Sequence, residues 1–234
     1  MSGEATVKNS RYERKFFIQN FSPVRAETYI KHNPARFTQI FHQRFINNIY
    51  LDTPKLTFFL DNVVGKSTRK KIRIRWYGEL FGKVEKPVLE FKLKSGATGT
   101  KLSFPLSGFT LDKNFNHNIL KAVFEKSDLP EWVREELFTV EPALINRYSR
   151  KYFQSFDKLF RTTIDYQLKY IHVDRTFNSF LRMKSDNSSV IVELKYGYEE
   201  DNNASLITNY FPFRMTKSSK YVNGIEIFRQ SLAL

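Results

Sequence analysis

The clearest pattern in the chain is an alternation of basic and apolar side chains that begins at Lys71. Successive side chains of an extended strand point to opposite faces, so Lys71, Arg73, Arg75 and Tyr77 share one face and the intervening apolar residues share the other. The pattern therefore predicts a strand with a cationic side and an apolar side. Like charges two positions apart lie only about 7 Å from one another, so an enclosed face of this kind suggests a polyanionic ligand.

The same alternation recurs along most of the chain, and the recurrence decides how it is interpreted. A single strand of this kind is typical of a sheet edge with a solvated face. Repetition in many strands instead favours an α+β fold in which a closed antiparallel β-barrel of about eight strands forms a charged tunnel, with helices packed on its outside. The charged or polar positions that share a face are Arg11, Glu13 and Lys15; Glu90, Lys92 and Lys94; Arg161, Thr163 and Asp165; and Glu193 and Lys195.

The remaining elements follow from apolar spacing and from turn residues. Further strands are predicted at 11–19, 45–52, 88–94, 101–106, 144–154, 159–171 and 190–196. Helices are predicted at 23–32, 112–126, 130–137 and 218–234, with Ile225 and Phe228 of the last one facing inward. The segment 95–101 is interpreted as a hairpin turn, 79–87 and 201–205 as polar loops, and Phe58, Phe59 and Leu60 as core residues in a turn region.

Length and composition limit the classes of protein that the chain can represent. Its 234 residues can form one large domain, which we place at 11–234 after a flexible N-terminus at 1–10. The formal net charge of +14 and the pI near 9.8 imply an anionic partner. The cations are interleaved with apolar residues inside strands, whereas duplex-binding cations usually lie on an exposed helix, arm or loop, so a nucleic-acid partner is disfavoured.

Two absences narrow the chemistry further. The chain has no cysteine, which excludes disulfides, thiolate metal sites and cysteine nucleophiles. The four histidines show no metal-ligand spacing, and we assign them no role. No stretch approaches the roughly 18 consecutive apolar residues that would span a bilayer, and no apolar signal region begins the sequence, so we expect a cytoplasmic location.

The order of these motifs resembles a known family, the VTC domain, which is the polyphosphate polymerase module of the triphosphate tunnel metalloenzyme superfamily. The resemblance runs from about residue 11 to about residue 229, and it depends on the number and order of short motifs that are individually weak. They are YERKF at 12–16, NIYLDT at 48–53, RIRWYG at 73–78, LEFK at 89–92, RYSR at 147–150, RTTID at 161–165, ELKY at 193–196 and SKYVNG at 219–224.

The resemblance implies a reaction and its participants. In that family the γ-phosphate of ATP is transferred to a growing inorganic polyphosphate chain, with Mn²⁺ or Mg²⁺ held by carboxylates. Sister members of the superfamily hydrolyse inorganic triphosphate or a nucleoside or RNA 5′-triphosphate. They carry paired glutamates in a Glu-x-Glu-x-Lys strand, whereas this chain has Arg11, Glu13 and Lys15 at those positions. That departure favours the polymerase, while hydrolysis and non-catalytic binding of polyphosphate stay open as alternatives.

The resemblance also assigns roles to particular residues. Arg73 and Arg75 match an arginine pair that binds phosphates in the family. The alternation at 146–152 could place either Arg147 or Arg150 on the inward face, and the family pattern favours Arg150. The catalytic positions implied are Lys15, Arg73, Arg75, Lys92, Arg150, Arg161 and Lys220; Lys94 and Lys195 join them in substrate binding, and Glu193 and Glu90 are the metal ligands. Glu13 and Lys195 are as well explained by an ion pair between strands.

The resemblance leaves the partners of the chain partly open. ATP with polyphosphate or triphosphate are the small-molecule partners implied. Eukaryotic relatives work inside membrane complexes, so a membrane-protein partner that holds this chain at the inner face of a membrane is a further expectation. The oligomeric state, the preferred metal and the length of any product stay open.

Overall fold

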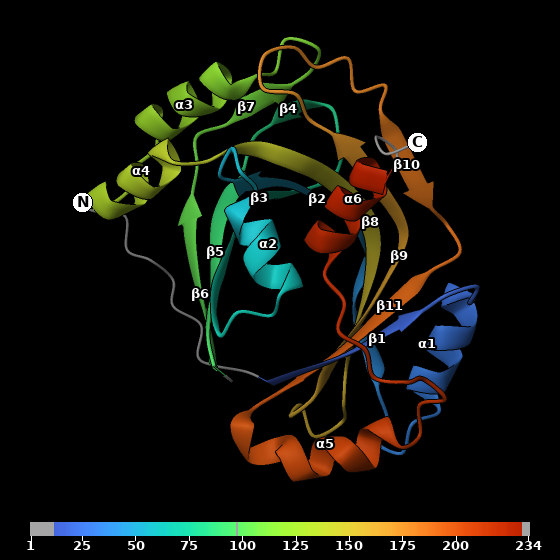
Figure 1. Cartoon of the computed structure of the whole chain (residues 1–234). Helices are drawn as coiled ribbons and strands as arrows, with labels where there is room; N and C mark the ends of the chain where they lie inside the picture. The colour runs from blue at the N-terminus through green and yellow to red at the C-terminus, as the bar shows by residue number, and fades with distance from the viewer. Residues whose placement is uncertain (1–11, 97, 231–234) are drawn as a thin grey trace.

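The structure is a computed structural model that describes residues 12–96 and 98–230. The N-terminal segment 1–10 predicted to be flexible, the residue Arg11 and the last four positions of the predicted closing helix lie outside the described residues. Across the described residues the chain alternates between long antiparallel strands and short helices (Figure 1). The predicted α+β class is therefore confirmed.

Eight strands form one antiparallel sheet in the order β1-β11-β9-β8-β2-β3-β5-β6, and β10 pairs with β9 beside this path. The alternating sequences described above are its strands, so side chains on each strand divide between the two faces. The strands of the sheet are β1 (Tyr12–Ile18), β2 (Thr38–Asp52), β3 (Thr68–Tyr77), β5 (Val88–Ser95), β6 (Thr98–Pro105), β8 (Glu141–Gln154), β9 (Arg161–His172), β10 (Met183–Asp186) and β11 (Val190–Tyr196). A small second sheet joins β4 (Gly82–Val84) to β7 (Phe109–Leu111).

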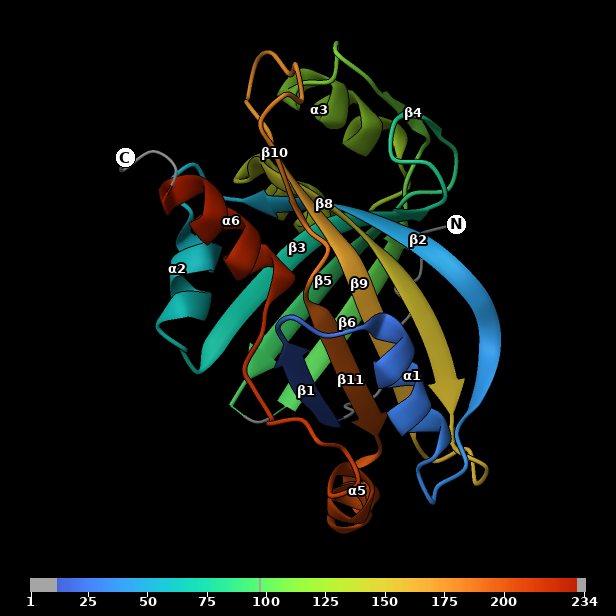
Figure 2. The ribbon, with the colours of Figure 1, turned by 90° about the vertical axis from the view of Figure 1, so that its right-hand side faces the viewer.

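Two pairs of helices cover different parts of the outer, apolar face of the large sheet (Figures 1 and 2). The helices α3 (His117–Lys126) and α4 (Glu131–Phe138) pack over β3 and β5, where Ile72, Ile74 and Phe91 are buried. The helices α1 (Pro23–Lys31) and α5 (Asp201–Thr208) pack over β1, β9 and β11, where Val192 and Leu194 are buried. The prediction that the apolar sides of the strands face surrounding helices is confirmed there.

Two further helices pack on the opposite, inner face, which corrects the prediction that all helices lie outside. The helix α6 (Lys220–Gln230) buries Tyr221, Ile225 and Phe228 against Tyr50, Tyr148 and Tyr170 of the sheet. The helix α2 (Thr57–Val63) contacts α6 through Phe59. The buried carboxylate of Asp52 links the two helices. It accepts hydrogen bonds from the backbone N–H groups of Phe58 and Phe59 in α2 and from the Tyr221 hydroxyl in α6. Part of the inner face is therefore apolar and filled.

The predicted closed barrel is not confirmed. Within the described residues, the hydrogen-bonded ladder ends at β1 on one side and at β6 on the other. The sheet nevertheless curls strongly. The curl brings Lys15 of β1 close enough to Lys71 of β3 and Lys94 of β5 for their charges to interact. A curled but open sheet thus forms the concave basic face.

A β-bulge in β9 maintains the side-chain pattern of the inner face. Ser149 pairs with Tyr166 and Arg147 with Lys169, so β9 has one residue more than β8 across this interval. Gln167 takes up the extra residue with a φ of 53°. Asp165 lies in the polar part of the inner face and Tyr170 in its apolar part although they are five positions apart, and a regular strand would have placed them on opposite faces.

Several local predictions need correction. The segment 201–205, predicted as a polar loop, begins the helix α5, and the predicted loop 79–87 contains β4. Strand β2 begins at Thr38, seven residues before the predicted start at Phe45. Of the three predicted core residues near α2, Phe58 and Phe59 are buried but Leu60 is 47% exposed. The hairpin predicted at 95–101 is confirmed, because β5 and β6 pair directly on either side of Gly96.

Candidate active site

The inner face of the sheet gathers charged side chains from seven strands and from the first residue of α6. Their positions follow from strand register, because residues paired across antiparallel strands point to the same side. Cations on this face clearly outnumber carboxylates. The cations are Lys15, Arg69, Lys71, Arg73, Arg75, Lys92, Lys94, Lys101, Arg150, Lys195 and Lys220, and the carboxylates are Glu13, Glu90, Asp165 and Glu193.

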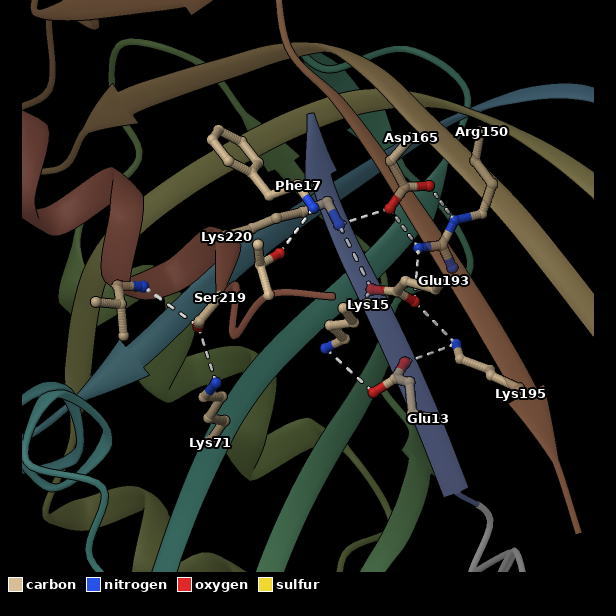
Figure 3. A network of polar contacts seen from close by, with 12 residues as sticks. Glu13, Lys15, Phe17, Lys71, Arg150, Asp165, Glu193, Lys195, Ser219 and Lys220 are labelled. Carbon is tan, nitrogen blue, oxygen red and sulfur yellow. Dashed lines mark hydrogen bonds and ion pairs between the residues drawn. The ribbon is translucent and has the colours of Figure 1, made fainter. Parts of the chain in front are cut away.

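A four-residue cluster of alternating charge joins β1 to β11 (Figure 3). The Nζ of Lys15 lies 3.1 Å from Glu13 and 3.6 Å from Glu193. The Nζ of Lys195 lies 3.3 Å from Glu13 and 3.1 Å from Glu193. Burial alone lowers the pKa of Lys15, but Glu193 and Glu13 outweigh it, so the net pKa is raised and this lysine stays charged. The ion pair between Glu13 and Lys195 that the sequence left open is therefore present.

Asp165, on β9, binds the two cations that complete this side of the face (Figure 3). Its carboxylate accepts hydrogen bonds of 2.5 and 2.6 Å from the Arg150 guanidinium and lies 2.5 Å from the Nζ of Lys220. Both cations also approach Glu193, at 3.7 and 3.8 Å. Burial would raise the pKa of Asp165, but Arg150 and Lys220 lower it below its usual value. The three groups are charged and fixed before any ligand binds.

Glu90 organises the opposite side of the face. Its carboxylate accepts a 2.7 Å hydrogen bond from Arg73 and lies 2.5 Å from Lys101 and 3.5 Å from Arg75. Burial would raise the pKa of Glu90, but Arg73, Arg75 and Lys101 lower it far below its usual value. Arg75 also donates to the side-chain oxygen of Asn48 at 3.2 Å. Glu90 thus holds the arginine pair in place.

Three lysines between these groups lack a carboxylate partner within 4.0 Å among the described residues. The charge of Arg73, followed by burial, lowers the pKa of Lys92 well below its usual value. Burial, followed by the charges of Lys15, Arg69 and Arg73, lowers the pKa of Lys71 to about 7. Burial, followed by the charge of Arg69, also lowers the pKa of Lys94. Neighbouring cations contribute to all three shifts and are the largest cause at Lys92, which shows that positive charge is crowded on this part of the face.

The segment just before α6 bridges the open side of the sheet. Thr216 donates its backbone N–H to the carbonyl oxygen of Lys15, and its hydroxyl accepts from the backbone N–H of Phe17. Three residues later, the Ser219 hydroxyl accepts a 2.8 Å hydrogen bond from the Nζ of Lys71. These contacts link β1 to β3, and they place Lys220 at the basic face (Figure 3).

The structure separates the sequence-predicted residues into groups. Lys15, Arg150, Lys195, Lys220 and Glu193 lie in one connected network, and Arg73, Arg75 and Glu90 lie in the second. Lys92 lies between them. Lys94 is exposed near the end of β5, and Arg161 is exposed at the start of β9, where it pairs in register with Lys195. Arg147 lies on the opposite face of the sheet, with its guanidinium 4.0 Å from the ring centre of Phe45.

Sequence reasoning missed five members of the site as candidates, two of which, Arg69 and Lys71, extend the cationic face of β3. Asp165 shares a face with Arg161 in the alternating pattern, and that signal could have identified it as a partner for a cation. Lys101 lies opposite Lys92 across the hairpin, and the hairpin register would have found it. Ser219 belongs to the SKY motif, but nothing in the sequence pairs it with Lys71.

The carboxylates divide clearly when they are considered as metal ligands. Among residues 12–96 and 98–230, no group of three or more His, Asp or Glu side chains is arranged to hold a metal ion. Glu13 and Glu193 fit a divalent cation that is also bound by phosphate oxygens, because both carboxylates contact the same two ammonium groups and lie on neighbouring strands. Glu90 fits less well, because Arg73 and Lys101 both lie 2.5 Å from its carboxylate, whereas the four cations around Glu193 lie 3.1–3.8 Å away.

Fold and site together define a class: an α+β protein whose curled antiparallel sheet presents an enclosed basic face suited to a polyanion. A family model described as the VTC domain matches residues 10–229, and the chain belongs to the VTC domain family. The resemblance noted in the sequence is thereby confirmed.

A solved structure also shares the fold. A putative adenylate cyclase from Bacillus halodurans superposes with a TM-score of 0.53 at 13% identity, over 91% of this chain and 95% of that one. A putative adenylyl cyclase from Hippeastrum, described as having a dominant triphosphatase activity, gives a TM-score of 0.49 at 16% identity, over 94% and 96%. No curated protein matches the sequence. Within the described residues, the helices are all too short or too polar to cross a membrane.

Proposed function

We propose that this chain is a metal-dependent phosphotransferase that moves the γ-phosphate of ATP onto a growing inorganic polyphosphate chain at its basic inner face. The observation that carries the proposal is the row of Lys71, Lys92 and Lys94, which have lowered pKa values and no carboxylate within 4.0 Å among the described residues, and which lie between two clusters of fixed arginines and lysines. A linear polyphosphate supplies negative charge at regular intervals and would neutralise this row. Membership in the VTC domain family agrees with that ligand.

The residues of the site suit phosphoryl transfer between phosphates. Arg73, Arg75 and Arg150 can each bind phosphate oxygens through two N–H groups, and their carboxylate partners already fix their orientation. The attacking group is a terminal phosphate oxygen of the polymer, which is anionic and needs no base. As its bond to the γ-phosphorus forms, the bond to the β,γ-bridging oxygen breaks and ADP leaves. The cations stabilise charge on the transferring group.

A divalent metal would be held by Glu193 and Glu13, with phosphate oxygens and water as its remaining ligands. When bound, Mg²⁺ or Mn²⁺ would neutralise charge on the β- and γ-phosphate oxygens. Phosphate oxygens would then take over Lys15 and Lys195, which contact both carboxylates in the ligand-free chain. We assign Glu90 to positioning of Arg73 and Arg75 instead of metal binding.

A second candidate function is hydrolysis of triphosphate or of nucleoside triphosphates. The observation that favours it is the approach of Glu13 and Glu193 to the same two lysines, because a pair of carboxylates beside a metal can also orient a water molecule. The two reactions differ in the attacking group, so their products separate them. A module that binds polyphosphate without turnover is the third outcome.

One experiment distinguishes these functions. The purified chain is incubated with ATP and Mn²⁺ or Mg²⁺, and the products are analysed by gel staining for long polyphosphate and by an orthophosphate assay. We expect a polymer ladder together with stoichiometric ADP. Orthophosphate without polymer would replace the polymerase with the hydrolase, and binding of polyphosphate without either product would leave a binding module.

The arginine pair provides the matching variant. Changing Arg73 and Arg75 together to Ala should abolish turnover, because it removes both guanidinium groups that Glu90 orients. The Lys66→Ala variant, which removes an exposed lysine away from the face, should retain activity and serves as the charge control. Circular dichroism and thermal melting establish that both variants fold. Full activity in the double variant would rule out the basic face as the site.

A further inference from the structure

A second cationic site lies on the outer face of the sheet, on the side opposite the candidate active site. A groove with a volume of about 580 Å³ is bounded by β2, β8, β9, β10 and the turn after β3. Small-molecule sites typically occupy about 300–1,000 Å³. Arg147 lines this groove, and it is the arginine of the RYSR motif that the inner face does not use.

The charges in the groove are not balanced. Arg147 and Lys169 are directly paired across β8 and β9, so two like charges lie side by side on one face. The one carboxylate that approaches Arg147 among the described residues is that of Glu79, which is 3.8 Å away and 88% exposed. Lys169 has no carboxylate within 4.0 Å in the same part of the chain. Burial lowers the pKa of Arg147, which is consistent with a cation that lacks full compensation.

Aromatic rings flank these cations. Phe45 is 38% exposed and Phe81 is 43% exposed, and both line the groove, as aromatic side chains commonly do in small-molecule sites. The guanidinium of Arg147 already stacks over the ring of Phe45, with 4.0 Å between its carbon and the ring centre. The ring of Phe81 packs against that of Phe180, with 5.2 Å between the ring centres. A planar ring of a ligand could contact the parts of Phe45 and Phe81 that stay exposed.

Polar groups complete the lining. The side chains of Gln167, Ser185 and Asn187 border the groove, and Gln167 is the residue at which β9 bulges with a φ of 53°. Amides and hydroxyls can donate to and accept from the edge of a heterocyclic base. The groove therefore combines features that suit the two parts of a nucleotide. The paired cations suit its phosphates, and the exposed rings and neutral polar groups suit its base.

We propose that this outer groove is a nucleotide-binding site in which Arg147 and Lys169 bind the phosphates and Phe45 and Phe81 contact the base. It is separate from the proposed reaction, because Arg147 and Arg150 are three positions apart on β8 and point to opposite faces. The carboxylate of Glu79 gives up its long contact with Arg147 when phosphate binds.

The test uses photolabelling of the intact chain. Azido-adenosine diphosphate is added together with excess tripolyphosphate, which occupies the inner face, and the irradiated protein is digested and mapped by mass spectrometry. We expect label on the peptides that carry Phe45 or Phe81, and we expect ADP to remove it more effectively than adenosine or inorganic phosphate alone. In the double variant Arg147→Ala, Lys169→Ala, the amount of label on these peptides should fall at least about tenfold, because both phosphate contacts are removed.

Controls make the result decisive. The double variant Lys55→Ala, Lys66→Ala removes the same amount of charge beside α2 and should keep the label. Phe81→Ala should weaken labelling about tenfold through loss of ring stacking. Label found on inner-face peptides alone, or unchanged by the loss of Arg147 and Lys169, would overturn the proposal. Groove label that forms in a parallel reaction without tripolyphosphate but is absent when tripolyphosphate is present would replace the nucleotide with a general polyanion and would also overturn the proposal.

The outcome is independent of the proposed function. Groove labelling in a chain that shows no ATP turnover would uphold this site while the phosphotransferase proposal failed. A polymer ladder from a chain without groove labelling would give the converse result.

Discussion

The lowered pKa of Lys71 makes a quantitative prediction about ligand binding. In the ligand-free chain, burial and the charges of Lys15, Arg69 and Arg73 lower the pKa of this lysine to about 7, with only a weak opposing effect from Glu13. A bound polyanion adds negative charge beside the ammonium group and favours its protonated form, so the pKa must rise on binding. The complex therefore takes up protons from the buffer.

The size of the uptake follows from the pKa and the pH. With a pKa of about 7, Lys71 is about one-tenth protonated at pH 8 and about nine-tenths protonated at pH 6. If binding returns the pKa toward 10.5, this group takes up about 0.9 proton at pH 8 but only about 0.1 proton at pH 6. Supplying that proton costs about 1.4 kcal/mol per pH unit above 7, so affinity should fall as pH rises.

Isothermal titration calorimetry measures this uptake directly. Tripolyphosphate is titrated into the chain at pH 6 and pH 8, each time in buffers of different ionisation enthalpy, and the slope of the observed enthalpy gives the protons bound. Lys71→Met should take up about 0.9 proton less than the unaltered chain at pH 8. Protonation of the ligand itself cancels in this difference.

The matched control and the refuting result are equally direct. Lys66→Met removes an exposed lysine that pairs with Asp61 and should leave the uptake unchanged. Equal proton uptake by the unaltered chain and by Lys71→Met at pH 8 would show that the ligand does not approach Lys71. The reasoning that places polyphosphate along the uncompensated lysines would then be wrong.

Three further predictions concern the buried groups around the basic face. Asp165→Asn should lower the free energy of unfolding by about 3–5 kcal/mol, measured by urea denaturation, because Arg150 and Lys220 would lose their shared carboxylate partner inside the protein. An unchanged free energy of unfolding would mean that water solvates both cations in place of the carboxylate. Glu193→Gln should raise the metal concentration for half-maximal turnover by at least about tenfold, and an unchanged metal requirement would exclude this carboxylate as a ligand. Gly224→Ala should cost about 1–3 kcal/mol of stability in the same denaturation assay, because its Cβ would overlap the side chain of Leu144; unchanged stability would mean that α6 shifts freely.

The charged face could be predicted from the sequence because strand alternation is local. A period of two assigns Arg73 and Arg75 to one side and Ile72 and Ile74 to the other without knowledge of the rest of the fold. The same rule placed Glu193 with Lys195, and the structure brings both to the inner face.

The parts that the sequence did not reveal depend on tertiary contacts. The bulge at Gln167 shifts the register of β9, and no turn residue announces it. The helix α6 lies on the inner face because Gly224 allows close approach to Leu144 and Tyr170, a packing relation that apolar spacing alone does not specify. Polar residues at 201–205 suggested a loop, but Ala204 and Ile207 are buried and hold α5 against the sheet.

The distribution of carboxylates explains how a face with this much positive charge can fold and still bind a polyanion. Glu90 and Asp165 pair mainly with arginines and with Lys220, which fixes the direction of those groups before a ligand arrives. Lys71 and Lys92 have no carboxylate partner among the described residues, and their lowered pKa values mean that part of their charge is lost. A bound polyphosphate would restore that charge by favouring the protonated lysines. The affinity for polyphosphate should therefore depend on pH through these lysines, whereas the contribution of the paired arginines should not change with pH.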